Sequence, residues 1–303
     1  MTIISVEQVA GRDRPKVRLS PGLLQPRLVS RRAGGHAHVA LVAGGAVLLG
    51  GDTVSIEVRV GTGCTLVVED VGGTVAYPAG PARAALTGEG VSTWDVDIEV
   101  ADGGRLIWET YPFVVATGAR VRRSTRVRIG TESTVCLRET IVLGRTGETG
   151  GAMTSSTDVR DCAGAPVFVE DLAIDGSEPL PGVLGEASVL DTAMLFGRRS
   201  LTEDADSQIL DLASPGAIAR AVGTAAHASH VDAVWDDWTQ SVLEPRGTQD
   251  DQVRPEAIDH GAVDRCIQTD GQSLSTPPSG SESTSPIQPP SDERPTAHEE
   301  ARS

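Results

Sequence analysis

Ile56-Glu-Val-Arg-Val60, the turn Gly61-Thr-Gly63 and Thr65-Leu-Val-Val-Glu69 form the first of three similar units between residues 52 and 145. The other two units are Val96-Asp-Ile-Glu-Val100 with Arg105-Leu-Ile-Trp-Glu109, and Thr125-Arg-Val-Arg-Ile129 with Val135-Cys-Leu-Arg-Glu139. The first strand of each unit alternates apolar and polar residues, which is typical of a β-strand with one buried face. A chain that repeats a two-strand unit buries apolar surface by stacking the units. We therefore predict a mostly β, β-helix or solenoid-like body of stacked sheets, built from three hairpin-like units.

The composition fits such a body and argues against nucleic acid as a partner. The 303 residues would allow about two ordinary domains, although a large β architecture can reach this size as one. Aromatic residues make up only 3% of the chain, so the core has to be built from Val, Leu, Ile and Ala. The formal net charge of −16 leaves no global basic field that would attract phosphates.

Cysteine usage and hydropathy indicate a cytoplasmic protein without a membrane segment. The four cysteines, Cys64, Cys136, Cys162 and Cys266, are widely spaced and form no Cys-x-x-Cys pair. Residues 1–17 contain no apolar run long enough for a signal peptide, and no later stretch is long enough to span a bilayer. We expect reduced thiols in the cytoplasm, with metal ligation by Cys64 or Cys136 as the minor alternative.

Strands are expected on both sides of the three units, whereas helical signals occur only late in the chain. Further strand-like stretches lie at 17–19, 28–29, 36–42, 155–159 and 166–174. Ser214-Pro215 has the form of an N-cap followed by proline at the first helical position, and an Ala-rich run follows it. Apolar residues then recur at three- and four-residue spacing up to Val242. The sequence therefore predicts a C-terminal helical pair at about 214–243 that completes a scaffold of residues 1–245.

The end of the chain has a different composition. From Arg246 onward the periodicity is lost, and Pro, Ser, Thr, Gln, Asp and Glu predominate. Such a segment buries too little apolar surface to offset its ordering entropy. We predict that residues 246–303 form a disordered, acidic, Pro/Ser-rich tail.

One carboxylate falls on an apolar strand face. Counting in twos from Val135 places Glu139 on the same side as Leu137 and Ile141. An unpaired charge is costly there, so Glu139 should be paired, protonated or directed into a wet interior channel. Glu69 and Glu109 end the second strands of the first two units, so a row of acids on one side of the stack is expected. The alternative is a structural bridge between Glu139 and Arg145 or another arginine.

Two histidines and two tryptophans are further candidates. His36 and His38 lie two apart on one strand face, a spacing compatible with metal binding, but no third ligand completes a known pattern and a solvated pair is the simpler interpretation. Trp235 and Trp238 are either core anchors of the last helix or a partner-docking face.

The usual enzyme signatures are missing from the sequence. It contains no Gly-x-Ser-x-Gly elbow, no phosphate-binding Gly-x-x-x-x-Gly-Lys-Ser/Thr loop and no His-Glu-x-x-His motif. The sequence therefore shows no familiar catalytic motif.

The motifs, in their order and spacing, resemble the urease accessory protein family UreD (also called UreH). The resemblance covers about residues 17–243 and is carried by three stretches. They are Gly50-Gly-Asp-Thr-Val-Ser-Ile-Glu-Val-Arg-Val60, Ala101-Asp-Gly-Gly-Arg-Leu-Ile-Trp108 and Glu139-Thr-Ile-Val-Leu-Gly-Arg-Thr-Gly-Glu-Thr-Gly-Gly151.

This resemblance implies a non-catalytic chaperone that binds apo-urease, docks a UreF-like helical partner and works with a UreG-like GTPase that carries nickel. It also implies an interior passage lined by polar and acidic groups as the nickel route, with nickel held only transiently and no tightly bound cofactor. Oxygen ligands suit transit because they hold nickel less tightly than thiolate or imidazole sets do. The candidate transit residues are Asp52, Glu69, Glu109, Glu139 and Glu148, with Arg145 as a structural pairing residue.

Two other functions fit the residues. One is a generic cytosolic β-scaffold for another metalloenzyme. The other is a β-helix enzyme acting on polysaccharide, which would need clustered carboxylates in an exposed groove and usually a secretion signal. Neither of these features is visible in the sequence.

Overall fold

The computed structural model describes residues 1–44, 48–81, 90–178, 181–200, 202, 208–225 and 231–244. The chain divides into two units, residues 1–260 and 261–303, and all described residues belong to the first. The acidic tail predicted for residues 246–303 lies outside the described residues.

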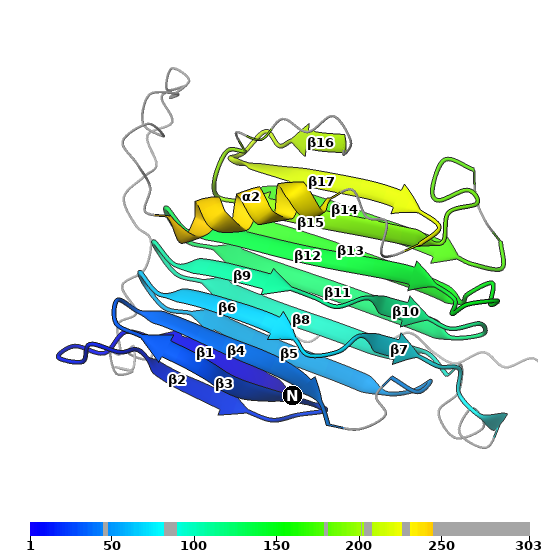
Figure 1. Cartoon of the computed structure of the whole chain (residues 1–303), viewed down its shortest axis with the longest axis horizontal. Coiled ribbons are helices and arrows are strands. Elements are labelled where there is room, and N and C mark those ends of the chain that lie inside the picture. The colour runs from blue at the N-terminus through cyan, green and yellow to red at the C-terminus, as the bar shows by residue number, and fades with distance from the viewer. Residues whose placement is uncertain are drawn as a thin grey trace, which may run out of the picture. The chain divides into compact units, whose positions relative to one another are not determined.

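Two β-sheets and one helix are the regular elements of the described part of the chain (Figure 1). Sheet A has seven strands in the order β14-β13-β11-β8-β5-β1-β2. These are β1 (Thr2–Glu7), β2 (Lys16–Ser20), β5 (Thr53–Val60), β8 (Ser92–Val100), β11 (Arg120–Ile129), β13 (Ala152–Asp161) and β14 (Pro166–Asp175).

Sheet B has ten strands, eight of them in the order β16-β17-β15-β12-β9-β6-β4-β3, with β7 and β10 beside this path. Their bounds are β3 (Leu24–Arg32), β4 (His36–Ala43), β6 (Thr65–Asp70), β7 (Thr74–Ala76), β9 (Arg105–Glu109), β10 (Phe113–Val115), β12 (Thr134–Leu143), β15 (Val189–Phe196), β16 (Gln208–Asp211) and β17 (Gly216–Gly223).

The three repeated units stack as the sequence predicts, but they are not hairpins. In each unit the first strand lies in sheet A and the second in sheet B, so the glycine turn carries the chain from one sheet to the other. Equivalent strands pair in parallel and in register: Val58 of β5 is opposite Ile98 of β8, which is opposite Val127 of β11. Gly63 and Gly103 take positive φ in their turns, a backbone conformation that glycine adopts at little cost. The expectation of a mostly β, solenoid-like stack is confirmed.

The core lies between the sheets and is built from β-branched and aliphatic side chains. Val39, Val58, Leu66 and Leu106 have no exposed surface. The residues that alternate with them point away from the core, which explains the polar positions of Glu57 and its equivalents.

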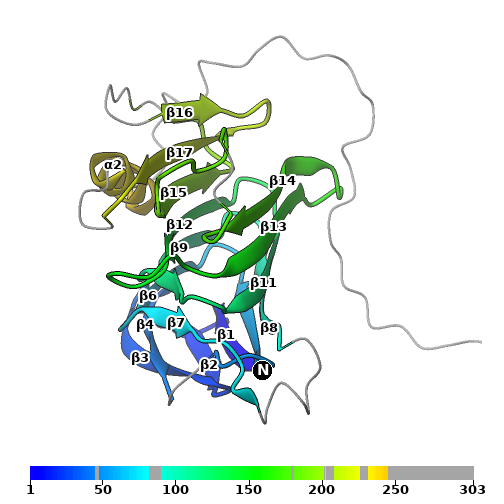
Figure 2. The same cartoon turned by 90° about the vertical axis from the view of Figure 1, so that its right-hand side faces the viewer.

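One helix, α2 (Asp232–Leu243), lies on the outer face of sheet B (Figure 2). It buries the apolar residues that the spacing had indicated, including Trp235 and Trp238. The predicted helical pair is wrong in its first member, because the Ala-rich run is strand β17. Side chains of this run alternate between two faces, as in a strand. Ala217 and Ala219 pack against the buried residues of α2, whereas Ile218 belongs to the core between the sheets. Alanine is small enough to let the two indoles approach the sheet.

Strands β1, β10, β15 and β16 had not been predicted. All eight residues of β15 are buried, so Val189–Phe196 shows no alternation that would mark it as a strand. None of the described helices is both long and apolar enough to cross a membrane.

Candidate functional site between the sheets

A layer of polar side chains crosses the otherwise apolar space between the sheets. In sheet B, Glu139 is opposite Thr192, which is opposite Arg220. In sheet A, Thr125 is opposite Thr157, which is opposite Glu170. We call the following residues the polar layer: Asp70, Thr110, Arg123, Thr125, Glu139, Thr157, Glu170, Thr192 and Arg220.

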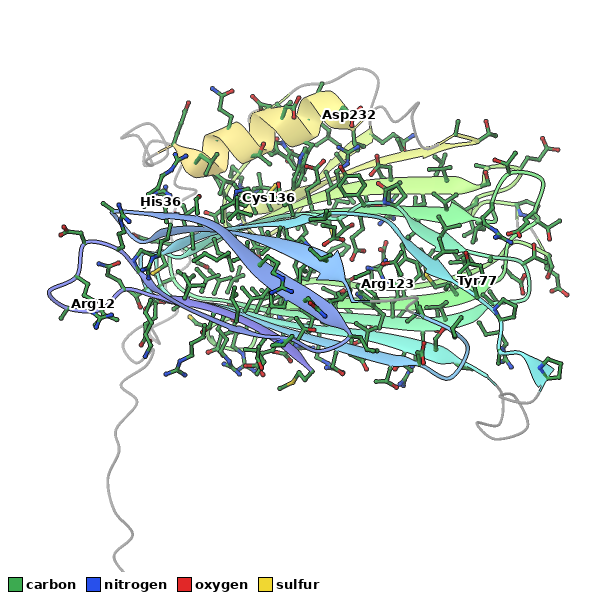
Figure 3. The ribbon with its side chains drawn as sticks, turned by 60° about the horizontal axis from the view of Figure 1, so that its bottom comes forward. Arg12, His36, Tyr77, Arg123, Cys136 and Asp232 are labelled. Atoms are coloured by element: carbon green, nitrogen blue, oxygen red, sulfur yellow. The ribbon has the colours of Figure 1, made fainter. Side chains whose placement is uncertain are left out.

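The centre of the polar layer is an ion pair between the two sheets. Arg123 Nη2 donates to Glu139 Oε1 at 2.7 Å, and the two side chains are only 5% and 15% exposed. The Arg123 guanidinium also lies over the ring of Phe113, with its Cζ 4.9 Å from the ring centroid. Figure 3 marks Arg123 between the strands of the two sheets. Glu139 is thus paired, which resolves the cost of its position on an apolar face.

Asp70 brings a second carboxylate to the same place. Trp108 Nε1 donates to Asp70 Oδ1 at 3.2 Å. Burial raises the pKa of Asp70 to about 6, although the Trp108 hydrogen bond, the Tyr111 backbone and the charge of Arg123 all act in the opposite direction. At pH 7 this carboxyl is therefore mostly ionised, and it becomes mostly protonated near pH 5.

Asp70, Trp108, Arg123 and Glu139 line a small cavity. Its volume is about 30 Å³, which is room for roughly one or two water molecules. Arg123 Nε has no hydrogen-bond partner among the described residues. The cavity therefore has carboxylate oxygens and an N–H donor in its wall.

The far end of the polar layer carries another ion pair. Arg220 binds both oxygens of Glu170, through Nη1 and Nη2, at 2.9 Å each. Arg220 Nε also donates to Thr192 Oγ1 at 3.2 Å. The two-pronged geometry fixes β17 against β14. With three carboxylates and two guanidinium groups, the polar layer is close to neutral with a small acidic excess.

The predicted row of acids is split between two faces of sheet B. Glu69 and Glu109 are opposite each other as expected, but the residue opposite Glu109 on β12 is Arg138. Glu139 comes one residue later, and a shift of one residue turns a side chain to the other face of a sheet. Glu69 and Glu109 consequently lie on the outer face of sheet B, and Glu139 lies in the interior.

The remaining candidates lie in turns and loops. Asp52 Oδ2 accepts the backbone N–H of Leu49 at 2.8 Å, just before β5. Arg145 pairs with Glu148 in an exposed loop, and does not pair with Glu139. The hydrogen bonds of Glu148 to the side chain and backbone of Arg145 lower its pKa to about 2. Within the described residues no three His, Cys, Asp or Glu side chains are placed to hold a metal ion, so the transit role of these carboxylates stays a prediction.

Trp235 and Trp238 are core anchors of α2. Their side chains are 4% and 1% exposed, and Trp238 Nε1 donates to Ser200 Oγ at 2.9 Å. This burial does not fit a docking face that a partner would contact directly. His38 Nε2 lies 3.1 Å from Glu69 Oε2 on the outer face of sheet B. Cys64 and Cys136 are free and buried, and burial raises the pKa of the Cys136 thiol.

Asp232 at the start of α2 is tied to the sheet through Arg138. Arg138 Nη2 contacts Asp191 at 2.8 Å and also Asp232, and Thr140 donates to Asp191 at 3.0 Å. Burial disfavours the charge of Arg138, but the hydrogen bonds and charges of the two aspartates outweigh this effect and raise its pKa. This network explains how the nearly inaccessible Asp191 keeps its charge compensated.

Of the nine residues in the polar layer only Glu139 had been singled out, and the other four charged ones were missed: Asp70, Arg123, Glu170 and Arg220. Arg123 was visible in principle, because counting in twos from Val121 to Ile129 places it on the buried face of β11. Glu170 gave a similar signal, because counting in twos from Phe168 to Ile174 places it on the buried face of β14. Arg220 gave none, since its stretch had been predicted as a helix.

Two stacked sheets that enclose a polar layer, with one helix across an outer face, define this protein as a β-solenoid with a partly polar core. The chain belongs to the UreD urease accessory protein family, which matches residues 5–247. This finding confirms the resemblance noted in the sequence and supports a role in urease maturation.

Several relatives bear the same family name. Urease accessory protein UreD 1 of Streptomyces griseus subsp. griseus is 35% identical over 242 residues, or 78% of this chain and 91% of that protein. Urease accessory protein UreD of Frankia alni is 38% identical over 174 residues, or 57% of this chain and 52% of that protein. UreD 1 of Saccharopolyspora erythraea is 36% identical over 182 residues, or 59% of this chain and 66% of that protein.

Proposed function

We propose that this protein is a non-catalytic chaperone of urease maturation. It holds apo-urease together with a UreF-like helical protein and a UreG-like GTPase while nickel is inserted. The observation that carries this proposal is the family match over residues 5–247, together with a relative that the chain covers over 91% of its length. A scaffold role also fits a body made of two extensively hydrogen-bonded sheets.

We further propose that the polar layer is the route by which nickel crosses this protein. Asp70, Glu139 and Glu170 offer carboxylate oxygens at successive places between the sheets, and oxygen ligands release divalent nickel readily. Nickel is the cargo here and not a resident cofactor. Because Glu139 and Glu170 are each paired with an arginine, the ion has to displace a guanidinium group at both places. Such displacement keeps binding weak, as transit requires.

The scaffold proposal is tested by co-purification. The tagged chain is co-expressed with the urease subunits and the UreF-like and UreG-like proteins, and we expect all of them in one complex. Recovery of the tagged chain without the UreF-like protein would contradict the proposal.

The route is tested by the nickel content of urease matured in the same cells. We expect Glu139→Gln to lower nickel per urease while the complex still forms. Glu109→Gln is the matched control, because Glu109 lies on the outer face of the same sheet. If urease has the same nickel content with both variants, the proposed nickel route is contradicted, whereas the scaffold proposal is unaffected.

A further inference from the structure

The two sheets end unevenly at β14 and β16. Sheet A stops at β14, which faces β17 through the ion pair of Glu170 and Arg220. Sheet B continues by one more strand, β16, which pairs only with β17 among the described strands. Figure 1 shows β16 as the last strand of sheet B, next to β17. The inner face of β16 therefore has no strand of sheet A opposite it in the described part of the chain.

Apolar side chains are exposed at this uncovered place. Leu210 of β16 is opposite Ile218, and Val222 of β17 is opposite Leu190, so both point toward the side of the core. Yet Leu210 is 64% exposed and Val222 is 55% exposed. Inward-facing aliphatic residues of a sheet are normally covered, and here a strand next to β14 would cover them.

The edge of β14 offers the hydrogen-bonding groups that such a strand needs. Gly176 N–H donates to Gly151 C=O, which fixes the alternation of bonded and non-bonded pairs between β14 and β13. Counting back from this bond, Leu172 and Ile174 bond to β13. The backbone groups of Val169, Asp171 and Ala173 face away from β13, and no described residue bonds to them. Three consecutive ladder positions are thus open on one strand.

The surroundings of the open edge are acidic. Beside its end lies a pocket of about 230 Å³ whose lining includes Leu143, Val183 and Leu184. Carboxylates surround the edge, the pocket and β16: Asp171, Asp175, Glu178, Glu186 and Asp211. Glu170 compensates Arg220. Arg120, Arg122 and Arg126 also line the surface beside Asp171, Asp175 and Glu178, but they belong to β11, which β13 separates from β14, so the carboxylates of β14 are the charges nearest to the open edge.

We propose that the edge of β14 is a docking site for an extended segment of a partner protein, which adds an eighth strand to sheet A. The segment alternates apolar residues, which cover Leu210 and Val222, with lysine or arginine, which face the acidic rim. Pairing of two β14 edges from two copies of this chain is disfavoured, because it would bring Asp171 and its neighbours against like charges. The inference concerns a surface outside the polar layer and does not rest on the nickel route.

A fluorescent peptide of about seven alternating valine and lysine residues serves as the probe, since this is a typical strand length. We expect saturable binding to the full chain in fluorescence anisotropy. In hydrogen exchange, the peptide should slow the amides of Val169, Asp171 and Ala173 by about tenfold or more. The same peptide with alternate N-methylated amides should bind about tenfold more weakly when its methylated edge is the one that meets β14.

The site variant is Ala173→Pro, which removes an edge N–H that β13 does not use. Its matched control is Ala173→Thr, which keeps the N–H and adds a side chain of similar size. We expect the proline variant to bind about tenfold more weakly, and the threonine variant to bind within about twofold of the original chain. If the proline variant does not fold, the exchange pattern and the N-methylated peptide still decide the question.

Several results would overturn the proposal. These are no binding up to about 1 mM peptide, protection at another strand edge, or equal affinities of the two Ala173 variants. A dimeric chain that Ala173→Pro converts to a monomer would assign the edge to a second copy. Binding that occurs only after removal of residues 246–303 would assign it to the chain itself.

Discussion

The ion pair of Arg123 and Glu139 allows the structural and transport roles of the polar layer to be separated. Both side chains are nearly inaccessible, at 5% and 15% exposure, and their N–O distance is 2.7 Å. Removing one partner of such a pair leaves an uncompensated buried charge and costs about 3–5 kcal/mol. For a folded part of this size, about 2–4 °C of Tm is lost per kcal/mol, so each single variant should unfold about 6–20 °C lower.

The two single variants should differ in a defined direction. In Glu139→Leu the guanidinium of Arg123 still has its cation–π contact with Phe113 and its electrostatic interaction with Asp70. In Arg123→Met both Glu139 and Asp70 lose their cation, so this variant should be the less stable one. The double variant Arg123→Met/Glu139→Leu removes both charges and should recover most of the stability, since neutral pairs of similar volume replace buried ion pairs well.

Thermal unfolding and nickel per urease are measured for all three variants. If Glu139 carries nickel, the double variant recovers its Tm but still matures urease poorly. If nickel content returns together with Tm, the pair has only a structural role and the proposed route is refuted. Equal destabilisation in the double variant and in the sum of the single variants would refute the buried-charge argument itself.

Three further predictions concern Asp70, Trp238 and residues 246–303. Asp70→Asn should flatten the pH dependence of stability: the raised pKa of Asp70 makes its protonated form the favoured one, so the native chain loses stability as the pH rises from about 4 to about 6. Urea unfolding at several pH values measures the free energy of unfolding of both chains. Relative to the original chain, the variant should become more stable by at most about 3 kcal/mol as the pH rises above 6, and a stability difference that does not change with pH would contradict this. Trp238→Ala should cost about 3–5 kcal/mol in urea unfolding because the indole is 1% exposed, whereas Trp238→Phe should cost less; an alanine variant of unchanged stability would show that α2 does not depend on this anchor. Deleting residues 246–303 should leave the complex with the UreF-like and UreG-like proteins intact in a pull-down, since the family match ends at residue 247; loss of either partner would show that these residues take part in binding.

The repeated strands could be predicted from the sequence because their alternation is local. Ile56–Val60 and its equivalents each carry the period of two on their own, and parallel stacking adds no new pattern. The Ala-rich run at 216–223 misled the prediction, because helix propensity is a weak local preference and the packing of Trp235 and Trp238 on small residues outweighs it. β15 could not be recognised, since a strand covered on both faces shows no alternation.

The interior site was predictable only in part, for a geometric reason. That Glu139 lies on a buried face follows from its own strand, and the structure bears this out. Its partner could not be chosen among the many arginines, because Arg123 reaches it across the gap between sheets and not along the sequence. The one-residue offset that separates Glu139 from Glu109 was equally hidden, since it is set by the register of β9 and β12.

The parallel stacking itself explains why the polar layer is continuous. In a solenoid, equivalent positions of successive strands lie side by side. Polar residues at equivalent inward positions therefore form a row across the sheet, at one level along the strands. Asp70, Thr110 and Glu139 occupy equivalent places on β6, on the segment after β9 and on β12, and Thr192 and Arg220 extend the level across β15 and β17. An isolated buried charge would need a partner of its own, whereas a row at one level can share two arginines among three carboxylates. A fold that stacks in register is thus suited to carry a polar path through an apolar core, because the cost of each buried group is offset by the next one along the row.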